Sequence, residues 1–329
     1  MPRRSAGLCA RSEPIDRVTA VPADQVGNLT CSELPDQPDA ALQQQLEALV
    51  RREGLWKPVQ SRTLALGLVD ITDIDAPRYA ALNPNHMMYA ASLPKIAILL
   101  GAYVEAAEGD LALEEGLHED MVRMIRYSDN ASATRVLERV GREDLMDILT
   151  SDRLRLYDPA RNGGLWVGKD YARQNAFRRD PLHNLSHGAT VYQVARFFYL
   201  LQKGELVAAE YRDDMLSILS EPGIEHKFVA GLRSRPVTEM YRKSGTWRDY
   251  HADAALVEAG DRRFIMVGMA RLCRVRHACA VTRRFMSACR IAASGLIRPA
   301  GYGVLAVVSM VVSGCASSMS FWMRVASVW

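Results

Sequence analysis

Acidic residues are absent from the last 59 positions of this 329-residue chain, although Asp and Glu occupy 38 positions before them. Residues 271–329 also lack Lys, Asn and Gln, while they hold eight arginines and four of the six cysteines. Residues 1–270 carry 33 bases against all 38 acids, a net charge of −5, whereas the whole chain carries +3. Such a break in composition indicates two different kinds of sequence joined near Arg271.

The low net charge, the few cysteines and the lack of an apolar N-terminal run exclude several classes of protein. A net charge of only +3 argues against a nucleic-acid binder held by a basic face. The six cysteines form no C-x-x-C pair and no zinc-ligand spacing, so we expect unpaired thiols and no metal site. Residues 1–30 contain no apolar run of the secretory type, so no signal peptide is visible. The apolar content of 49% is that of a globular protein.

The chain is expected to have three parts. Residues 1–38 are rich in Pro, Asp and Ser and predict a loose leader, residues 39–270 predict a folded domain, and residues 271–329 predict an atypical tail. Within the tail, residues 281–293 weakly resemble a helix, and the charge-free residues 299–323 are long enough to span a bilayer. Three interpretations of the tail stay open: an altered reading frame or fusion, a membrane anchor through 299–323, and an unusual soluble segment.

Hydrophobic periodicity places the elements of the folded part. Helical spacing predicts helices at 39–54, for about fifteen residues from Ser92, and at 119–126, 131–140, 143–149, 190–203 and 208–219. Alternating apolar residues predict strands at 63–72, 78–82, 237–247, 251–258 and 263–270, the last three as an antiparallel meander. Residues 157–188 are irregular, and a loop of that length in a compact domain is usually functional.

Three short motifs follow one another along this domain: Ser92-Leu-Pro-Lys95, Ser128-Asp129-Asn130 and Lys243-Ser244-Gly245. Their joint occurrence by chance is on the order of a few in ten thousand. Ser92 is predicted at the start of a helix, where orphan N–H groups favour developing negative charge, and Lys95 one turn later is expected within reach of its hydroxyl. Lys95 can act as a base only if burial or a nearby cation such as Lys243 lowers its pKa.

Each motif also has an ordinary structural interpretation. Ser92 could cap its helix, and Lys95 could be a solvated helix lysine. Residues 128–130 could form a turn and N-cap before the next helix, a role that is compatible with catalysis. Lys243 could be a strand residue before a bulge. The three motifs together favour the chemical interpretation.

This set of motifs resembles that of the active-site serine β-lactamases and penicillin-binding proteins, most closely the class A β-lactamases. The resemblance covers about residues 39–270. It implies a two-lobed catalytic domain with an α/β (α+β) fold of the β-lactamase/transpeptidase type, in which helices flank a five-stranded antiparallel sheet beside an all-helical lobe.

The resemblance also implies the catalytic roles. Ser92 would be the acylated nucleophile, Lys95 its proton acceptor, and Ser128 the relay of a proton to the departing amide nitrogen. Backbone N–H groups of Ser92 and Thr246 would form the oxyanion hole.

Substrate-binding roles follow from the same resemblance. Asn130 would hold the substrate's side-chain amide. Lys243, Ser244 and Thr246, in a strand segment that includes Gly245, would bind the substrate carboxylate.

The chain departs from the class A pattern in two places. Only 36 residues separate Ser92 from Ser128, which predicts a more open site. Class A enzymes use a loop glutamate to activate the water that frees the acyl-enzyme, whereas the corresponding loop here, from Asp158 to Asp170, contains no Glu. Asp158 and Asp170 are candidates to replace that glutamate, although surface or capping roles are commoner for such residues. Lys169, in the same loop, could simply be a solvent-exposed lysine. We therefore expect slow deacylation.

Other candidate residues carry a weaker signal. His183 and His187 are four residues apart, but their segment precedes a helix and contains no H-E-x-x-H, so we expect no metal there. Trp166 and Trp247 could line the cleft, although core aromatics are commoner.

The function expected from the sequence is a serine acyl-hydrolase of class A β-lactamase type that cleaves β-lactam amides through an acyl-serine. A D-alanyl-D-alanine peptidase or esterase with the same nucleophile, and a non-enzymatic β-lactam sensor, are the alternatives. The partner would be a small β-lactam or a peptidoglycan-like peptide, with no cofactor and no nucleic acid, and the chain is expected to be a monomer. The resemblance implies a periplasmic location, which contrasts with the absence of a visible signal peptide.

Overall fold

The computed structural model describes residues 30–172 and 175–271. Its centre is a five-stranded antiparallel sheet in the order β2-β1-β10-β9-β8, which confirms the expected fold class. The strands are β1 (Leu64–Asp70), β2 (Arg78–Leu82), β8 (Glu239–Trp247), β9 (Tyr250–Ala259) and β10 (Arg262–Arg271). Each lies within two residues of its predicted range. Strand β8 forms one edge of the sheet and is paired only with β9.

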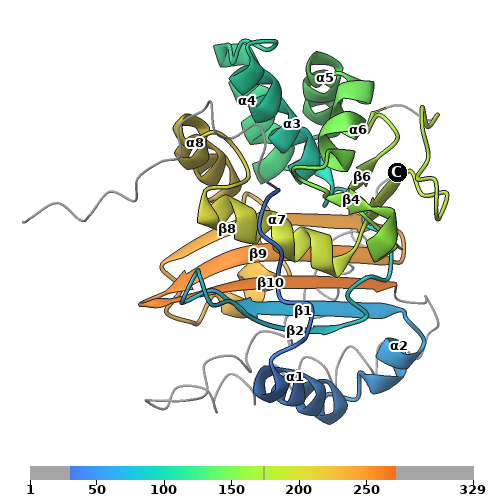
Figure 1. The fold of residues 1–329 in the computed structure, drawn as a ribbon, viewed down its shortest axis with the longest axis vertical. Coiled ribbons are helices and arrows are strands. Elements are labelled where there is room, and N and C mark those ends of the chain that lie inside the picture. The colour runs from blue at the N-terminus through green and yellow to red at the C-terminus, as the bar shows by residue number, and fades with distance from the viewer. Residues whose placement is uncertain (1–29, 173–174, 272–329) are drawn as a thin grey trace, which may run out of the picture.

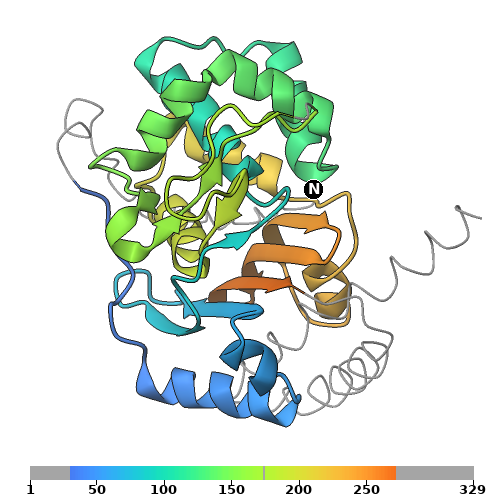
Figure 2. The same cartoon turned by 90° about the vertical axis from the view of Figure 1, so that its right-hand side faces the viewer.

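Helices cover both faces of this sheet (Figures 1 and 2). On one face lie α1 (Ala40–Arg52), α2 (Trp56–Gln60) and α9 (Phe228–Leu232). On the other lie α3 (Lys95–Glu108), α4 (Glu115–Arg126), α5 (Asn130–Val140), α6 (Arg142–Thr150), α7 (Val191–Lys203) and α8 (Ala209–Leu219). The predicted longer helices are confirmed, while the five-residue helices α2 and α9 are too short for periodicity to reveal.

Strand β1 shows how the sequence builds the two cores. Leu64, Leu66 and Leu68 point to the α1 side, whereas Ala65 and Val69 point to the α7 side, as the two-residue period of a strand requires. Gly67 lies against α7, because a Cβ built there would come within 2.4 Å of the Val191 side chain. Helix α7 therefore packs directly on the sheet, between it and the helical lobe that α3, α4, α5 and α6 form (Figure 1).

The segment between α6 and α7 contains short strands where we expected irregular structure. These are β4 (Tyr157–Asp158), β5 (Gly163–Gly164), β6 (Trp166–Val167) and β7 (His187–Ala189), with a 3-10 turn at Pro159–Arg161. Strand β7 pairs with β6 and also with β3 (Met88–Tyr89), which immediately precedes the Ser92 motif. This pairing brings the loop against the motif that lies about 100 residues earlier.

The described part of the expected leader, residues 30–38, is held in place rather than loose. The guanidinium of Arg196, fully buried in α7, donates to the carbonyls of Cys31 and Ser32 and forms an ion pair with Glu33. Leu34 is buried in the same core. These residues are held in place because a buried guanidinium requires hydrogen-bond acceptors, and residues 31–33 supply them. The expectation was wrong for these residues.

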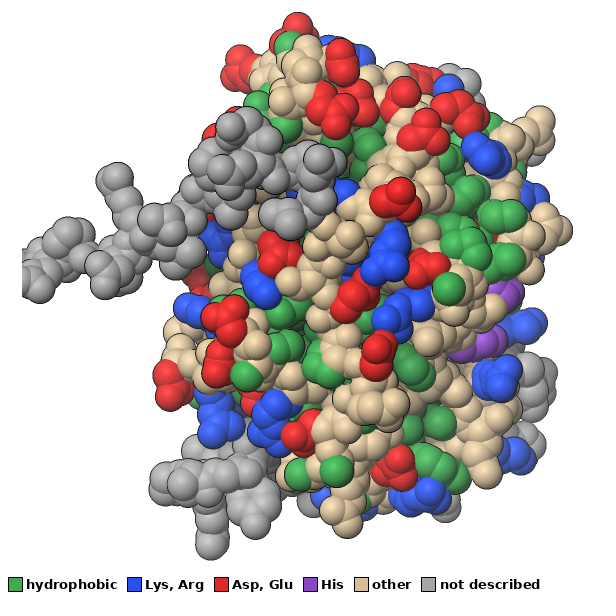
Figure 3. Space-filling view, viewed as in Figure 1, with side chains coloured by type: hydrophobic (Ala, Val, Ile, Leu, Met, Phe, Trp, Pro, Cys, Tyr) green, Lys and Arg blue, Asp and Glu red, His purple; other side chains and the backbone are tan. Residues whose placement is uncertain are grey.

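The helical lobe is acidic on its surface, and acidic side chains gather there in Figure 3. Exposed acids of this lobe include Glu108, Asp110, Glu115, Glu119 and Asp147. Acidic side chains are thus prominent on the exposed surface of this lobe.

Several expectations lie outside the described residues. They concern residues 1–29, the tail cysteines, the weak helix at 281–293 and the apolar residues 299–323. Within 30–172 and 175–271, no helix is long and apolar enough to cross a membrane.

Candidate active site

Ser92 lies in a tight turn that joins β3 to α3. Ala91 has φ +51°, and backbone hydrogen bonds from Leu93 to Ala90 and from Lys95 to Ser92 close the turn. Helix α3 begins at Lys95, so the expectation that Ser92 starts the helix is off by three residues. Pro94 precedes the helix and lacks an N–H to donate, which suits the last residue of the turn.

Lys95 is fully buried where the turn meets the α4–α5 connection. Its Nζ donates to the carbonyls of Ser128 (2.6 Å) and Asp129 (3.1 Å) and to Oδ1 of Asn130 (2.8 Å). The Tyr171 ring lies 4.6 Å from Nζ and contributes a cation–π contact. These acceptors use all three donors of an ammonium group. Contrary to expectation, no hydrogen bond joins Lys95 to the Ser92 hydroxyl in the described structure.

Burial sets the protonation of this lysine. Removal from water lowers the pKa of Lys95 to about 7, and the carboxylate of Asp129 acts in the opposite direction as the smaller of the two effects. A substantial fraction of the side chain is therefore the neutral amine near pH 7. The requirement that burial lower this pKa is met by the packing of α3 against the α4–α5 connection.

Ser128 connects the two lysines. Its backbone carbonyl accepts from Lys95, and its Oγ accepts from Nζ of Lys243 at 2.9 Å. Ser128 has φ +60°, a left-handed conformation, and Asp129 caps α5 by accepting from the Ser132 N–H. Residues 128–130 thus do form a turn and N-cap. Burial, followed by the charge of Lys95, holds the pKa of Lys243 well below its usual range.

Strand β8 brings the third motif to the Ser92 turn. A Cβ built on Gly245 would lie 2.2 Å from the Ala90 carbonyl oxygen and 2.8 Å from the backbone nitrogen of Ser92. Only glycine allows this approach, because any side chain would strike backbone atoms. The contact places the backbone of β8 directly beside the N–H of Ser92.

Lys227 is a buried cation that the sequence analysis missed. Its Nζ donates to the carbonyls of Gly245 and Ala252, which are paired across β8 and β9, and to Oγ1 of Thr246 at 3.0 Å. Because the Thr246 hydroxyl accepts from Lys227, its own proton is left to donate elsewhere. No motif marks Lys227, although it is one of only six lysines in the chain.

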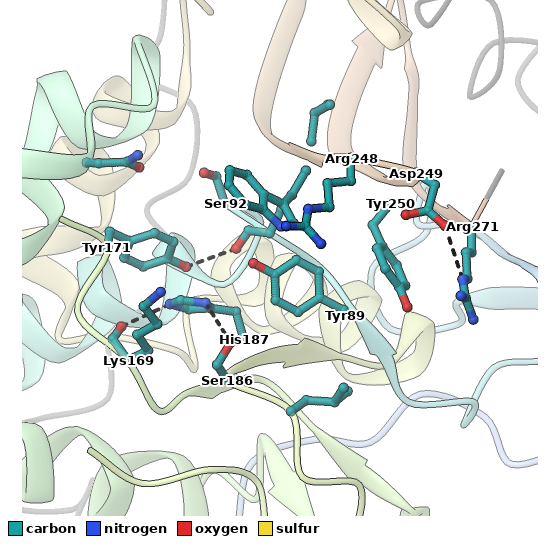
Figure 4. Close-up of a pocket in the computed structure, with 15 residues that line it drawn as sticks. Tyr89, Ser92, Lys169, Tyr171, Ser186, His187, Arg248, Asp249, Tyr250 and Arg271 are labelled. Atoms are coloured by element: carbon teal, nitrogen blue, oxygen red, sulfur yellow. Dashed lines mark hydrogen bonds and ion pairs between the residues drawn. The ribbon is translucent and has the colours of Figure 1, made fainter. Parts of the chain in front are cut away.

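A cleft of about 570 Å³ opens from Ser92 along the β8–β9 turn (Figure 4). Tyr171, His187 and Lys169 form one wall, and the segment from Thr246 to Tyr250 forms the other. Asn130, Tyr89, Leu185, Ser186, Ala91 and Arg271 complete the lining. His187 is buried, which lowers its pKa to about 4, and its Nε2 lies 2.9 Å from the carbonyl oxygen of Lys169, to which it donates. It is therefore a neutral wall residue near pH 7.

The two candidate aspartates are engaged elsewhere. Asp170 is buried and forms a bidentate ion pair with Arg142 at 2.8 and 2.9 Å. Asp158 accepts from the backbone N–H of Ala160 at 2.9 Å. Neither lines the cleft. Among the residues described, no carboxylate of the 158–170 loop faces Ser92.

The remaining candidates separate into wall and core. Trp247 lines the cleft and is 55% exposed, whereas Trp166 is buried and packs against Tyr157. His183 is exposed and contacts the Asn162 carbonyl, apart from the buried His187. In the part of the chain that the structure describes, no three His, Cys, Asp or Glu side chains are grouped to hold a metal ion.

Solved structures with the same arrangement identify the fold. A β-lactamase from Sphaerobacter thermophilus superposes with a TM-score of 0.56 at 16% identity, covering 79% of this chain and 99% of that one. PBP-A gives 0.55 at 19% identity, covering 87% and 100%. A β-lactamase from Chitinophaga pinensis gives 0.55 at 13% identity, covering 73% and 99%. The sheet and the helical lobe therefore define a β-lactamase/transpeptidase fold.

The sequence profile of the Beta-lactamase enzyme family matches residues 117–282, half of the chain, and the protein belongs to that family. The match includes Ser128 to Asn130 and Lys243 to Thr246, while Ser92 and Lys95 precede it. No curated protein sequence matches the chain.

The close approach at Gly245 generates a first prediction. Gly245→Ala should slow acylation by a β-lactam about 10²-fold, because the added Cβ pushes β8 away from the Ser92 turn by about 1 Å. The rate is measured by intact-mass spectrometry over time. Gly116→Ala is the matched control, since nothing lies within 4 Å of its added Cβ. Equal rates in both variants would contradict the contact.

The pKa of Lys95 generates a second prediction. The acylation rate should fall about tenfold for each pH unit below pH 7, because the ammonium cannot accept the Ser92 proton. Asp129→Asn retains an N-cap side chain but removes the carboxylate that raises this pKa, so its profile should move to lower pH. A profile that stays in place or moves to higher pH would show that another group controls the rate.

Proposed function

We propose that this protein is a serine acyl-hydrolase of class A β-lactamase type, with Ser92 as nucleophile and β-lactam amides as substrates. The observation that carries the proposal is the buried Lys95, with its pKa near 7, beside the Ser92 turn and linked through Ser128 to Lys243. Family membership supports a hydrolase of this general type.

Acylation begins when Lys95 is neutral. The amine then has two N–H donors for three acceptors, so one contact is given up and a lone pair becomes free to accept the Ser92 proton. The Ser92 oxygen bonds to the carbonyl carbon, and the amide C–N bond breaks. Ser128 passes its proton to the departing nitrogen and is restored by the proton that Lys95 took up.

Charge on the reacting carbonyl oxygen would be stabilised by the N–H groups of Ser92 and Thr246. The Gly245 contact supports this role, since it sets the two backbones beside each other. One such donor is typically worth about 3–4 kcal/mol in the transition state. The substrate carboxylate would lie against Lys243, Ser244 and the Thr246 hydroxyl. That hydroxyl can donate to the carboxylate because it accepts from Lys227 and keeps its own proton free. Gly245 would contribute through its backbone. Asn130 would hold the side-chain amide.

Deacylation is expected to be the slow step. Release of the ester needs a water and a base within hydrogen-bond reach. Asp158 caps a turn and Asp170 is paired with Arg142, so the loop that provides this base in class A enzymes offers none. Lys95 would have to serve both steps.

The lack of a loop base also favours the second candidate function. A penicillin-binding enzyme that cleaves D-alanyl-D-alanine peptides, or a sensor, is acylated by β-lactams and releases them slowly. A PBP-A mutant, a protein of the same fold, was solved as an acyl-enzyme complex with penicillin G. Release of D-alanine from a peptidoglycan-like peptide would identify the peptidase.

The nucleophile assignment generates a third prediction. Mixing the protein with benzylpenicillin should add one equivalent of its mass, and Ser92→Ala should abolish this adduct. Lys95→Ala should form it more slowly by about 10²–10⁴-fold, the usual cost of a missing general base. An adduct of undiminished yield on Ser92→Ala would refute the assignment.

Slow deacylation generates a fourth prediction. A chromogenic cephalosporin should give a pre-steady-state burst near one equivalent, followed by steady turnover about 10²–10⁴-fold slower than a class A enzyme with its base in place. Fast turnover without a detectable acyl-enzyme would mean that another residue activates the water.

A further inference from the structure

Arg248 occupies a strained position at the far end of the cleft. Trp247 and Tyr250 are paired across β8 and β9, so Arg248 and Asp249 form a two-residue hairpin turn. Arg248 is the first of these and has φ +52°, a conformation that two-residue turns usually reserve for glycine. A side chain kept at such a position at a site suggests a function for that side chain.

The guanidinium of Arg248 is available to a ligand. The residue is exposed and lines the cleft, and its guanidinium carbon lies 5.6 Å from the centre of the Trp247 ring. Within the described ranges, no carboxylate forms an ion pair with it. The nearest acid of the turn, Asp249, pairs with Arg271 at 3.2 Å.

The surroundings of Arg248 are aromatic and cationic. The Tyr89 and Tyr250 rings meet edge to face with centroids 5.3 Å apart, and Figure 4 shows them between Ser92 and Arg271. Arg271 lies over the Tyr250 ring at 5.4 Å. Burial raises the pKa of Tyr89, and the nearby charge of Arg248 opposes this shift. Lys169 on the opposite wall adds positive charge.

The direction of β8 decides which part of a substrate reaches Arg248. In the proposed function, the substrate carboxylate lies at Lys243 and Ser244 and the reacting carbonyl lies at Thr246. Each strand residue advances about 3.3 Å, so the acyl side chain continues past Trp247 and arrives at Arg248. The leaving-group half of the substrate extends the other way.

We propose that Arg248 selects acyl donors whose side chain carries a carboxylate next to an aromatic ring. The ring would pack among Tyr89, Trp247 and Tyr250, and the carboxylate would accept hydrogen bonds from the Arg248 guanidinium. This inference rests on the proposed function. It adds a preference for a second negative charge on the acyl side, separate from the carboxylate of the leaving-group half.

Three penicillins that differ at one carbon test the preference: α-carboxybenzylpenicillin, α-aminobenzylpenicillin and benzylpenicillin as reference. The rate of mass-adduct formation is measured for each with the full chain. We expect the α-carboxy compound to acylate the protein about threefold to tenfold faster than the α-amino compound. The difference should shrink in about 1 M salt, because screening weakens partly exposed ion pairs.

Variants at Arg248 separate charge from turn geometry. Arg248→Gln should reduce the ratio of the two rates to within about twofold of one, and Arg248→Lys should retain most of it. Arg248→Gly should also abolish the preference while raising the melting temperature, since it removes the strain. Arg62→Gln is the matched control, because Arg62 is also exposed with φ +54° but lies outside the cleft, and it should keep the wild-type ratio.

The outcomes distinguish the two claims. Adducts from all three penicillins with an equal ratio in wild type and Arg248→Gln would overturn the role of Arg248 and leave the proposed function standing. Faster acylation of the wild-type protein by the α-amino compound would also overturn the role of Arg248 without affecting the proposed function. No adduct from any of the three would overturn the proposed function and this inference with it.

Discussion

Burial of the Lys95 amine between α3 and the α4–α5 connection is the constraint on which the rest of the site depends. A lysine removed from water must find acceptors, and here the carbonyls of Ser128 and Asp129 and the amide of Asn130 provide them. These contacts fix residues 128–130 against the Ser92 turn. The same burial brings the pKa to about 7, so one packing arrangement positions the second motif and, in the proposed function, prepares the base.

The third motif depends on a different kind of contact. Gly245 allows the edge strand β8 to contact the backbone of the Ser92 turn. Lys227 donates hydrogen bonds to the carbonyls of Gly245 in β8 and Ala252 in β9. The sheet and the helical lobe therefore meet at backbone atoms near Ser92. Lys243 then reaches Ser128 across that junction. The proposed mechanism needs both contacts, because its reacting groups come from two lobes.

Local patterns were sufficient for much of this structure. Periodicity placed α1 and β10 to within two residues. The motif spacing predicted Ser92, Lys95 and Lys243 as site residues, and in the fold both lysines bind Ser128. The expected contact between the Ser92 hydroxyl and Lys95 was not found in the described residues, because Nζ of Lys95 donates instead to the Ser128 and Asp129 carbonyls and to Asn130. Tyr171, His187 and Lys227 could not be predicted, since they carry no motif and reach the site only through tertiary packing. The ion pair between Asp170 and Arg142 likewise could not be predicted, because the fold alone brings these two residues together.

The protonation of Lys95 is tested most directly by nuclear magnetic resonance. The chain contains only six lysines, so protein labelled with 13C at the lysine Cε gives six signals, and Lys95→Arg identifies the one that belongs to Lys95. Following its shift from pH 5 to pH 11 measures the pKa without relying on any substrate. A midpoint near 7 is the predicted result. A midpoint above about 9, close to the value of a solvated lysine, would contradict the role of Lys95 as the base.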